Sequence, residues 1–225
     1  MNELSRHVSP TRKATLRLNL GKQLGLQAGD ALVVVDVQRD FLPGGALAVA
    51  DGDRIIPRLN AYLATFTAHR LPVFLTRDWH PYDHCSFKDR GGRWPTHCVR
   101  ETPGADWPAD LQVPDTARVV SKAAEKDREA YSAFEGTALA SILGDLNVRR
   151  LFVGGLATDY CVRATVLDAR KHGLQVVVLN DAVRGVEAAA GDSDRALRDM
   201  VAQGAVLYEH VQRVRGKQNG EPLSV

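Results

Sequence analysis

The stretch that decides the fold is ALVVVDVQ, residues Ala31 to Gln38. A continuous apolar run rich in β-branched residues is typical of a strand buried on both faces, and the turn cluster LPGG at residues 42–45 ends it. Residues 53–69 space their apolar side chains as a helix does, and LPVFLTRD (Leu71 to Asp78) is a second buried strand. This β-α-β unit predicts a parallel sheet, because parallel strands need a crossover connection.

The same alternation continues to the end of the chain. Further strands are predicted at Ala117–Ala123, Arg149–Ala157, Gln175–Asp181 and Ala205–Val211, with helices around residues 138–143, at Asp159–Gly173 and at 192–203. We therefore expect an α/β fold: a doubly wound, mainly parallel sheet with helices on both faces. Residues 79–114 lack any periodicity, and a loop of that length inside a compact domain is usually functional.

Composition narrows the class of protein. The 225 residues are 44% hydrophobic and 25% charged, which is typical of one globular domain. The formal charge of +2 is too small to predict a nucleic-acid or anionic-membrane partner. No apolar run reaches the roughly 18 residues that cross a bilayer, and the N-terminus lacks the apolar core of a secretory signal. We expect a cytoplasmic protein whose three cysteines, an odd and widely spaced set, stay reduced.

Charged and nucleophilic residues stand where the predicted strands end. Asp36 lies inside the first strand, Lys122 ends the third, and Cys161 follows the fourth within the first turn of a predicted helix, where the helix dipole favours a thiolate. Open parallel sheets bind ligands at the carboxyl ends of their strands, so three adjacent strand ends would supply a base, a cation and a nucleophile. The alternative is a structural carboxylate, a solvated lysine and a core cysteine.

A second group of residues suits a metal ion. Asp78 and His80 are two residues apart on one side of an extended segment, and His97 can return to them through the long loop. One carboxylate and two imidazoles with open positions suit zinc, iron(II) or manganese, and His84 is a candidate fourth ligand. The alternative is that these histidines hydrogen-bond the long loop to itself.

Together these segments resemble a known family. The chain contains ALVVVDVQRDFLPGGALAV (residues 31–49), TRDWHPYDHCSF (76–87), WPTHC (94–98), a lysine followed by EAYSAF (129–134), and GLATDYCVRATVLDARKHG (155–173). In this order they resemble the nicotinamidase/pyrazinamidase branch of the isochorismatase-like cysteine hydrolases, from about Ala31 to Val211. The resemblance implies the doubly wound α/β fold and a cytoplasmic enzyme of NAD salvage that hydrolyses nicotinamide, and pyrazinamide as well, through a cysteine thioester.

The resemblance also implies roles for individual residues. Asp36, Lys122 and Cys161 are expected to be catalytic, and the backbone amides of Ala157 and Cys161 to form the oxyanion hole, after a cis peptide bond between Leu156 and Ala157. One divalent metal ion, zinc first and iron or manganese as alternatives, is expected on three ligands. The expected metal ligands are Asp78, His80 and His97, and the expected substrate-binding residues are Phe41, Trp94, Leu156 and Tyr160.

The chain is expected to divide into three parts. Residues 31–211 form the hydrolase domain, residues 212–225 form a polar tail, and residues 1–30 carry five basic and two acidic side chains. We expect this basic extension to be a packed or dimer-contacting arm of a possible homo-oligomer, with a transit-like leader or a misplaced start as alternatives. The rival functions are an N-carbamoyl or ureido hydrolase of the same family, which would not need the metal ligands, and a non-catalytic ligand-binding member of the fold.

Overall fold

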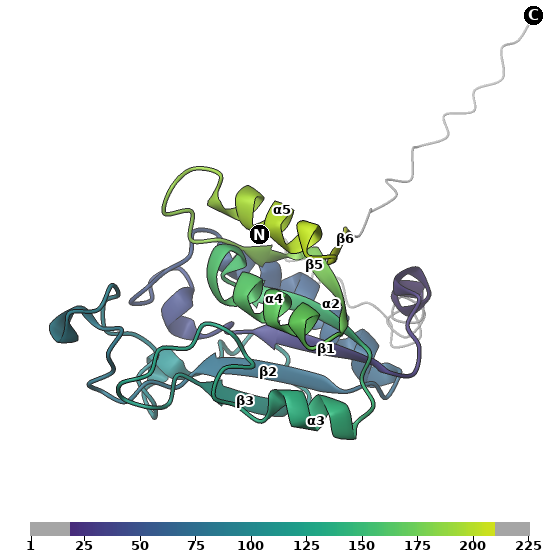
Figure 1. The fold of residues 1–225 in the computed structure, drawn as a ribbon, viewed down its shortest axis with the longest axis horizontal. Helices are drawn as coiled ribbons and strands as arrows, with labels where there is room; N and C mark the ends of the chain where they lie inside the picture. Colours follow the sequence, from purple (N-terminus) through teal and green to yellow (C-terminus); the bar gives the residue numbers. More distant parts are fainter. Residues whose placement is uncertain (1–18, 210–225) are drawn as a thin grey trace, which may run out of the picture.

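A six-stranded parallel sheet forms the centre of the computed structural model, which describes residues 19–209 (Figure 1). The strands are β1 (Asp30–Val35), β2 (Val73–Asp78), β3 (Arg118–Lys122), β4 (Arg150–Leu156), β5 (Gln175–Arg184) and β6 (Val206–Tyr208). Their order across the sheet is β3-β2-β1-β4-β5-β6, and every described pair is parallel. The chain order reverses between β1 and β4, which is where doubly wound sheets bind their ligands. The predicted fold class is confirmed.

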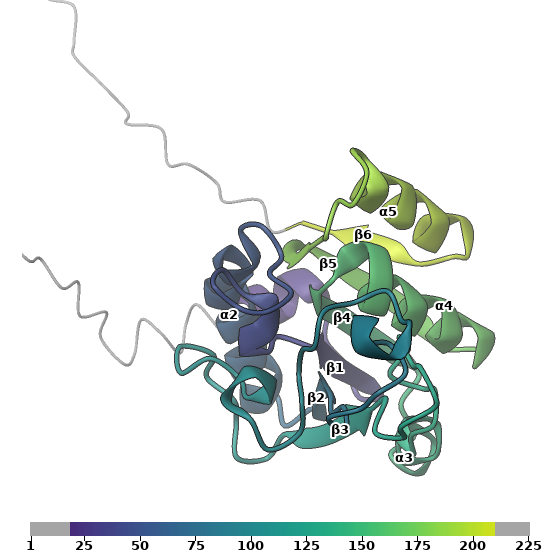
Figure 2. The ribbon, with the colours of Figure 1, turned by 90° about the vertical axis from the view of Figure 1, so that its left-hand side faces the viewer.

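Helices cover both faces of the sheet, as Figure 2 shows. They are α2 (Ile56–Ala68), α3 (Leu139–Asp145), α4 (Arg163–Lys171) and α5 (Asp192–Ala202), with short helical turns η1 (Arg39–Phe41), η2 (Gly52–Ile55), η3 (Lys88–Arg90), η4 (Pro103–Ala105) and η5 (Thr158–Val162). Helix α2 packs its apolar side chains, Leu59 and Leu63 among them, on one face of the sheet. Helices α3, α4 and α5 cover the other face, where Val166 and Met200 are fully buried. Each face therefore has its own apolar core.

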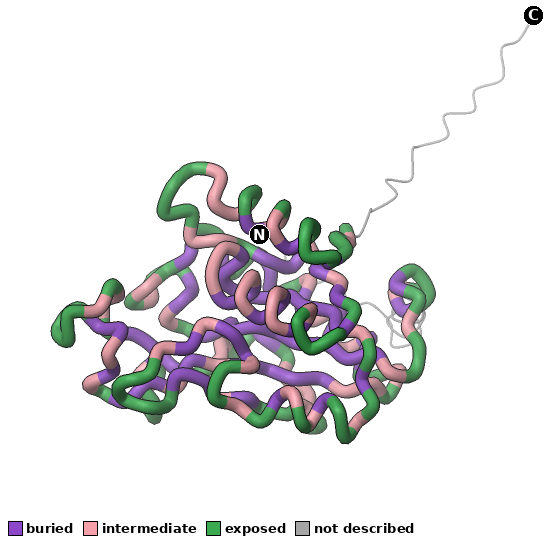
Figure 3. Tube along the Cα trace, in the orientation of Figure 1, coloured by how far each residue is buried: buried purple, intermediate pink, exposed green. Residues whose placement is uncertain are grey.

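The central strands are buried on both faces (Figure 3). All six residues of β1 are buried, and β4 lies directly beside it with Val35 paired to Gly155. A side chain at Gly155 would overlap Val35, since a Cβ atom there would lie 2.1 Å from the Val35 carbonyl oxygen. The glycine lets the two strands at the switch point stay in contact just before the chain turns into the site.

Several predicted boundaries are wrong. Strand β1 ends at Val35, so Asp36 follows the strand in a left-handed conformation (φ 47°) and does not lie inside it. The helix expected at Asp159–Gly173 begins instead as the π-helical turn η5 and becomes α-helical only at Arg163. Strand β5 continues past Asp181 to Arg184, and β6 ends at Tyr208. Residues 210 and 211 of the predicted last strand lie outside the described residues.

The described part of the predicted extension packs on the domain. Residues 19–24 are helical, and Leu24 is buried against the same core as α2. Asp30 already belongs to β1. The rest of the extension, residues 1–18, lies outside the described residues, so its role stays a prediction. Within residues 19–209, no helix is long and apolar enough to cross a membrane.

Candidate active site

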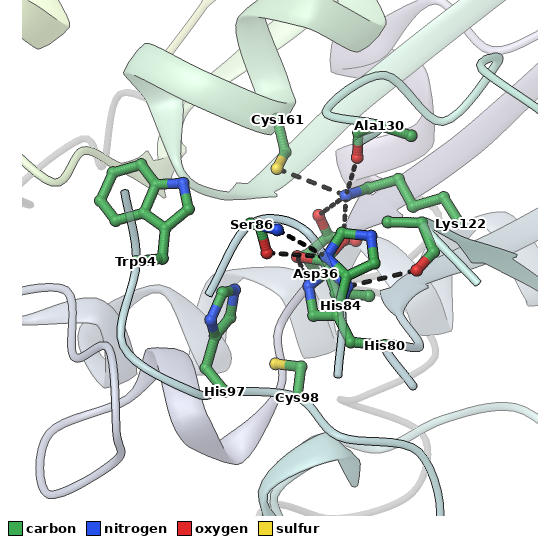
Figure 4. Close-up of polar contacts among 12 residues, drawn as sticks. Asp36, His80, His84, Ser86, Trp94, His97, Cys98, Lys122, Ala130 and Cys161 are labelled. Atoms are coloured by element: carbon green, nitrogen blue, oxygen red, sulfur yellow. Dashed lines mark hydrogen bonds and ion pairs between the residues drawn. The ribbon is translucent and has the colours of Figure 1, made fainter. Parts of the chain in front are cut away.

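The predicted catalytic residues meet at the carboxyl ends of the central strands. Asp36 follows β1, Asp78 and Lys122 are the last residues of β2 and β3, and Cys161 lies in η5 directly after β4. Figure 4 shows the side chains of Asp36, Lys122 and Cys161 pointing toward one another. The expectation of three adjacent strand ends is corrected, because β2 lies between β3 and β1. The long Lys122 side chain reaches across β2 to make the contact.

Lys122 is the centre of this cluster. Its ammonium lies 3.0 Å from Asp36 Oδ2 and forms a second ion pair with Asp78. It also donates to the Ala130 carbonyl (3.2 Å) and lies 3.5 Å from Cys161 Sγ. Burial disfavours a charged lysine, but the two carboxylates overcome it and raise the pKa of Lys122 well above its ordinary value. One cation therefore serves two fully buried carboxylates.

The two carboxylate oxygens of Asp36 have different partners, because Oδ2 lies only in the ion pair with Lys122. Thr76 donates its hydroxyl hydrogen to Asp36 Oδ1 (2.5 Å), whereas Oδ2 is buried and accepts no hydrogen bond in the described structure. Burial raises the pKa of Asp36; the nearby Asp78 charge adds to this rise, and Lys122 opposes it. A buried carboxylate with a raised pKa, one oxygen of which is held only by an ion pair, has the properties of a general base.

Cys161 is a buried thiol beside that base. Burial raises the pKa of the thiol well above its ordinary value, and the attraction of Lys122 only partly opposes this. The sequence-based expectation that the helix end would favour a resting thiolate is therefore not what the site shows. Ligand-type atoms of Asp36, Asp78 and Cys161 lie within 4.8 Å of one another. The nucleophile is thus suited to activation by proton transfer to a neighbouring carboxylate.

Asp78, His80 and His97 form the second group. All three are buried, and one ligand atom from each lies within 4.8 Å of the other two. His80 Nδ1 lies 3.2 Å from the Ala123 carbonyl and His97 Nδ1 lies 2.7 Å from the Pro95 carbonyl, so both Nδ1 atoms carry the hydrogen. His80 Nε2 is buried with no hydrogen-bond partner. A buried imidazole lone pair without a partner fits a metal ligand oriented by a second hydrogen bond.

His84 does not join this group. Its Nδ1 lies 2.7 Å from the Ser86 hydroxyl and its Nε2 lies 3.0 Å from the Arg128 carbonyl, so both ring nitrogens are engaged. The His84 ring instead packs against His80, with the two ring centroids 4.2 Å apart. In this arrangement His84 supports a neighbouring ligand, which corrects the expectation of a fourth one.

A cavity with about 390 Å³ of empty space, its open mouth included, borders both groups. Its lining contains all four predicted substrate-binding residues together with Cys161 of the first group and Asp78 and His97 of the second. The residues are Phe41, Leu47, Val49, Asp78, Trp94, His97, Tyr131, Leu156, Ala157, Tyr160, Cys161 and Val186. The sequence reasoning missed Leu47, Val49, Tyr131 and Val186 as lining residues. Tyr131 lies within the EAYSAF segment and could have been found there, whereas nothing distinguishes Val186 in the sequence.

Aromatic rings form one wall of the cavity. The rings of Trp94 and Tyr160 meet edge to face with centroids 5.2 Å apart, and Trp94 Nε1 donates to the Tyr131 hydroxyl (2.9 Å). Phe41 contacts His97 with a centroid distance of 5.5 Å. Such a wall suits a flat aromatic ligand, because offset and edge-to-face ring contacts are favourable.

The chain leaves β4 through a cis peptide bond between Leu156 and Ala157, as the resemblance implied. Ala157 then precedes η5, which carries Cys161. Ala157 and Cys161 both line the cavity. Their expected role as an oxyanion hole stays a prediction.

Comparison with known proteins agrees with this geometry. The nicotinamidase of Escherichia coli (strain K12) is 38% identical over 199 residues, which cover 79% of this chain and 93% of that protein. The crystal structure of Pyrococcus horikoshii pyrazinamidase in complex with zinc superimposes with a TM-score of 0.78 at 50% identity, covering 81% of this chain and 99% of that one. PnC1 from L. infantum in complex with nicotinate gives 0.75 at 36% identity, covering 81% and 93%.

The Isochorismatase domain model matches residues 30–212. That range contains every strand of the sheet and every residue of the two buried groups. The chain therefore belongs to the isochorismatase domain family.

Proposed function

We propose that this protein is a metal-dependent amidohydrolase that converts nicotinamide to nicotinate and ammonia, accepts pyrazinamide as well, and serves NAD salvage. The observation that carries the proposal is that Cys161, held beside Lys122 and Asp36, lines the same aromatic-walled cavity as Asp78 and His97, which lie with His80 in a possible metal-binding group. Similar proteins are named nicotinamidase, nicotinamidase/pyrazinamidase and pyrazinamidase, which supports the proposal.

The first half of the reaction forms a thioester. Asp36 Oδ2 takes the proton of the Cys161 thiol, and Lys122 stabilises the negative charge that results. The sulfur then forms a bond to the carboxamide carbon, and the carbonyl electron pair moves to oxygen. The backbone amides of Ala157 and Cys161 hold this oxyanion; such donors typically lower the barrier by about 2.7–4 kcal/mol each. Asp36 returns its proton to the departing nitrogen, and ammonia leaves.

In the second half of the reaction, water replaces the Cys161 thiol as the nucleophile and Asp36 again acts as the base. Asp36 takes a proton from water, the hydroxide oxygen attacks the thioester carbon, and the carbon–sulfur bond breaks to release the acid. The proton on Asp36 returns to the sulfur, so the site ends as it began.

Asp78, His80 and His97 would hold a divalent ion, for which we propose zinc. When bound, that ion supplies a coordination position for the ring nitrogen of the substrate and so orients the ring. The aromatic wall of Trp94 and Tyr160 contacts the same ring. Both contacts select flat nitrogen heterocycles with a carboxamide.

The test is ammonia release from a panel of amides, with metal content measured on the same preparation. We expect turnover of nicotinamide and pyrazinamide and a stoichiometric divalent metal. Turnover of an N-carbamoyl substrate by protein that holds no metal and ignores chelators would favour the rival hydrolase, and binding without turnover would indicate a non-catalytic member. Placement in the cytoplasm and assembly into a homo-oligomer complete the proposal, and cell fractionation and light scattering test them.

A further inference from the structure

Gln38 is a fully buried side chain that the proposed mechanism leaves without a role. It lies two residues after Asp36, and its amide makes three hydrogen bonds. Nε2 donates to the Asp78 carbonyl (2.8 Å) and the Ala105 carbonyl (2.9 Å), and Oε1 accepts the Asp78 N–H (2.8 Å). One side chain thus satisfies both backbone polar groups of Asp78.

The reason lies in the way the two strands end. The β1–β2 ladder runs from Leu32–Val73 to Val34–Leu75, and β1 itself stops at Val35. Strand β2 continues to Asp78, which therefore has no partner strand on that side. The Gln38 amide occupies the position of a peptide group there, because it offers a donor and an acceptor in one plane.

Asp78 is held on its other side by the regular sheet, where it pairs with Lys122 of β3. Its backbone is therefore fixed from both sides, and its carboxylate must serve both Lys122 and the metal group. Without Gln38, two buried backbone groups would lose their partners, and the strand end could move toward water to recover them. The third bond, to Ala105, also fastens the long loop that carries His97.

We propose that Gln38 is a positioning residue for the metal site: its side-chain amide replaces the missing strand beside Asp78 and so fixes the carboxylate that binds the ion. The inference rests on the metal part of the proposed function and adds a residue to it. Partners of this kind typically contribute about 10- to 100-fold to metal affinity.

The experiment compares Gln38→Leu and Gln38→Glu with a matched control, Asn60→Leu. Asn60, a half-buried residue of α2, also bridges a donor and an acceptor of the backbone, here at the far end of the loop of residues 79–114: Nδ2 donates to the Asp110 carbonyl and Oδ1 accepts the Gln112 N–H, both at 2.8 Å. Zinc affinity is measured on metal-free protein by competition with a chromophoric chelator, and cobalt-substituted protein reports ligand geometry through its visible absorption. Substrate is not needed for either readout.

We expect both Gln38 variants to bind zinc about 10- to 100-fold more weakly and to alter the cobalt spectrum, while Asn60→Leu keeps both. Glutamate is nearly isosteric with glutamine and retains the oxygen that accepts the Asp78 N–H, but it lacks the amide donor. The Gln38→Glu variant therefore tests the role of Gln38 if Gln38→Leu does not fold. Equal affinities in all variants, or an equal loss in the Asn60 control, would overturn the inference. A wild-type protein that binds zinc but does not turn over nicotinamide would overturn the proposed function and leave this inference standing.

Discussion

The parallel sheet carries buried charge at both ends of its strands, and the two ends differ in how that charge is satisfied. At the amino end, Asp30 and Arg150 face each other in register and form a bidentate pair, with Nε–Oδ1 and Nη2–Oδ2 distances of 2.8 and 2.6 Å. The Gln27 N–H completes the shell of the carboxylate. Every oxygen of Asp30 has a partner, although the residue is only 1% exposed.

The carboxyl end leaves its buried charge incompletely satisfied. Within residues 19–209, three buried side-chain atoms have no hydrogen-bond partner, and two of them, Asp36 Oδ2 and His80 Nε2, belong to the candidate site. The third is Asp181 Oδ2. Each of the three lies near an ionisable group: Asp36 Oδ2 is 3.0 Å from Lys122 Nζ, His80 Nε2 is 3.6 Å from Asp78 Oδ2, and Asp181 Oδ2 is 3.6 Å from Arg58 Nε. A buried polar group costs free energy when it lacks a partner, so such atoms mark places where a ligand or a proton completes the arrangement. The charged pair at the amino end of the strands therefore has a structural role, whereas the buried polar groups at the carboxyl end form the candidate active site.

Of the substitutions considered, the removal of Lys122 should have the largest effect on stability and on activity. Lys122→Met leaves Asp36 and Asp78 buried without a cation, which typically costs about 3–5 kcal/mol. We expect a fall of this size in the free energy of unfolding of the metal-free protein, measured in urea, together with loss of amide hydrolysis. An unchanged midpoint would show that the two carboxylates do not depend on Lys122.

Asp36→Asn changes the chemistry with little change in shape. The amide cannot accept the thiol proton, so kcat for ammonia release should fall by roughly 10²- to 10⁴-fold while the thermal midpoint stays close to that of the wild type. Steady-state assays and a thermal scan measure the two quantities. A kcat within tenfold of the wild type would remove Asp36 from the role of base.

His80→Ala tests whether His80 Nε2, which has no hydrogen-bond partner in the protein, is a metal ligand. We expect metal content to fall far below one ion per chain, and we expect a chelator no longer to lower the melting temperature, because the ion no longer binds the native state preferentially. Elemental analysis and thermal scans with and without chelator provide the measurement. Stoichiometric metal in this variant would contradict the assignment of His80 as a ligand.

The smallest effect is expected at the amino end. Asp30→Asn weakens hydrogen bonds to a charged partner and should cost about 1–3 kcal/mol of unfolding free energy. The kcat and the zinc affinity should not change, because this pair lies at the opposite ends of the same strands. A fall in kcat or in zinc affinity in Asp30→Asn would show that the two ends of the strands are coupled, and it would contradict a purely structural role for the Asp30–Arg150 pair.

The sheet could be predicted from the sequence because burial on both faces leaves a clear trace. The run from Ala31 to Val35 is apolar without interruption, and shorter apolar runs occur in β2, β4 and β5, whereas β3 and β6 at the sheet edges are partly exposed. Asp36, Asp78 and Lys122 were found because a charge at the end of such a run is unusual. Contacts made by the connecting segments leave no comparable trace in the sequence, so neither the Ser86 and Arg128 partners of His84 nor the cavity position of Val186 could be predicted.

The strand order and the local helix geometry could not be predicted from the sequence either. Lys122 and Asp36 seemed to stand on neighbouring strands, whereas the sheet places β2 between them and a long side chain closes the gap. The π-helical turn that carries Cys161 has the same residue pattern as an ordinary helix start. Burial, which depends on the whole fold, then decides that the pKa of the thiol is raised.

The central claim is that Cys161 attacks the carboxamide carbon of nicotinamide. The direct measurement is ammonia release by the wild type and by Cys161→Ala, with zinc content determined on the same two preparations. The account predicts steady turnover by the wild type, none by the variant, and equal metal in both. Substantial ammonia release from the metal-loaded variant would contradict it.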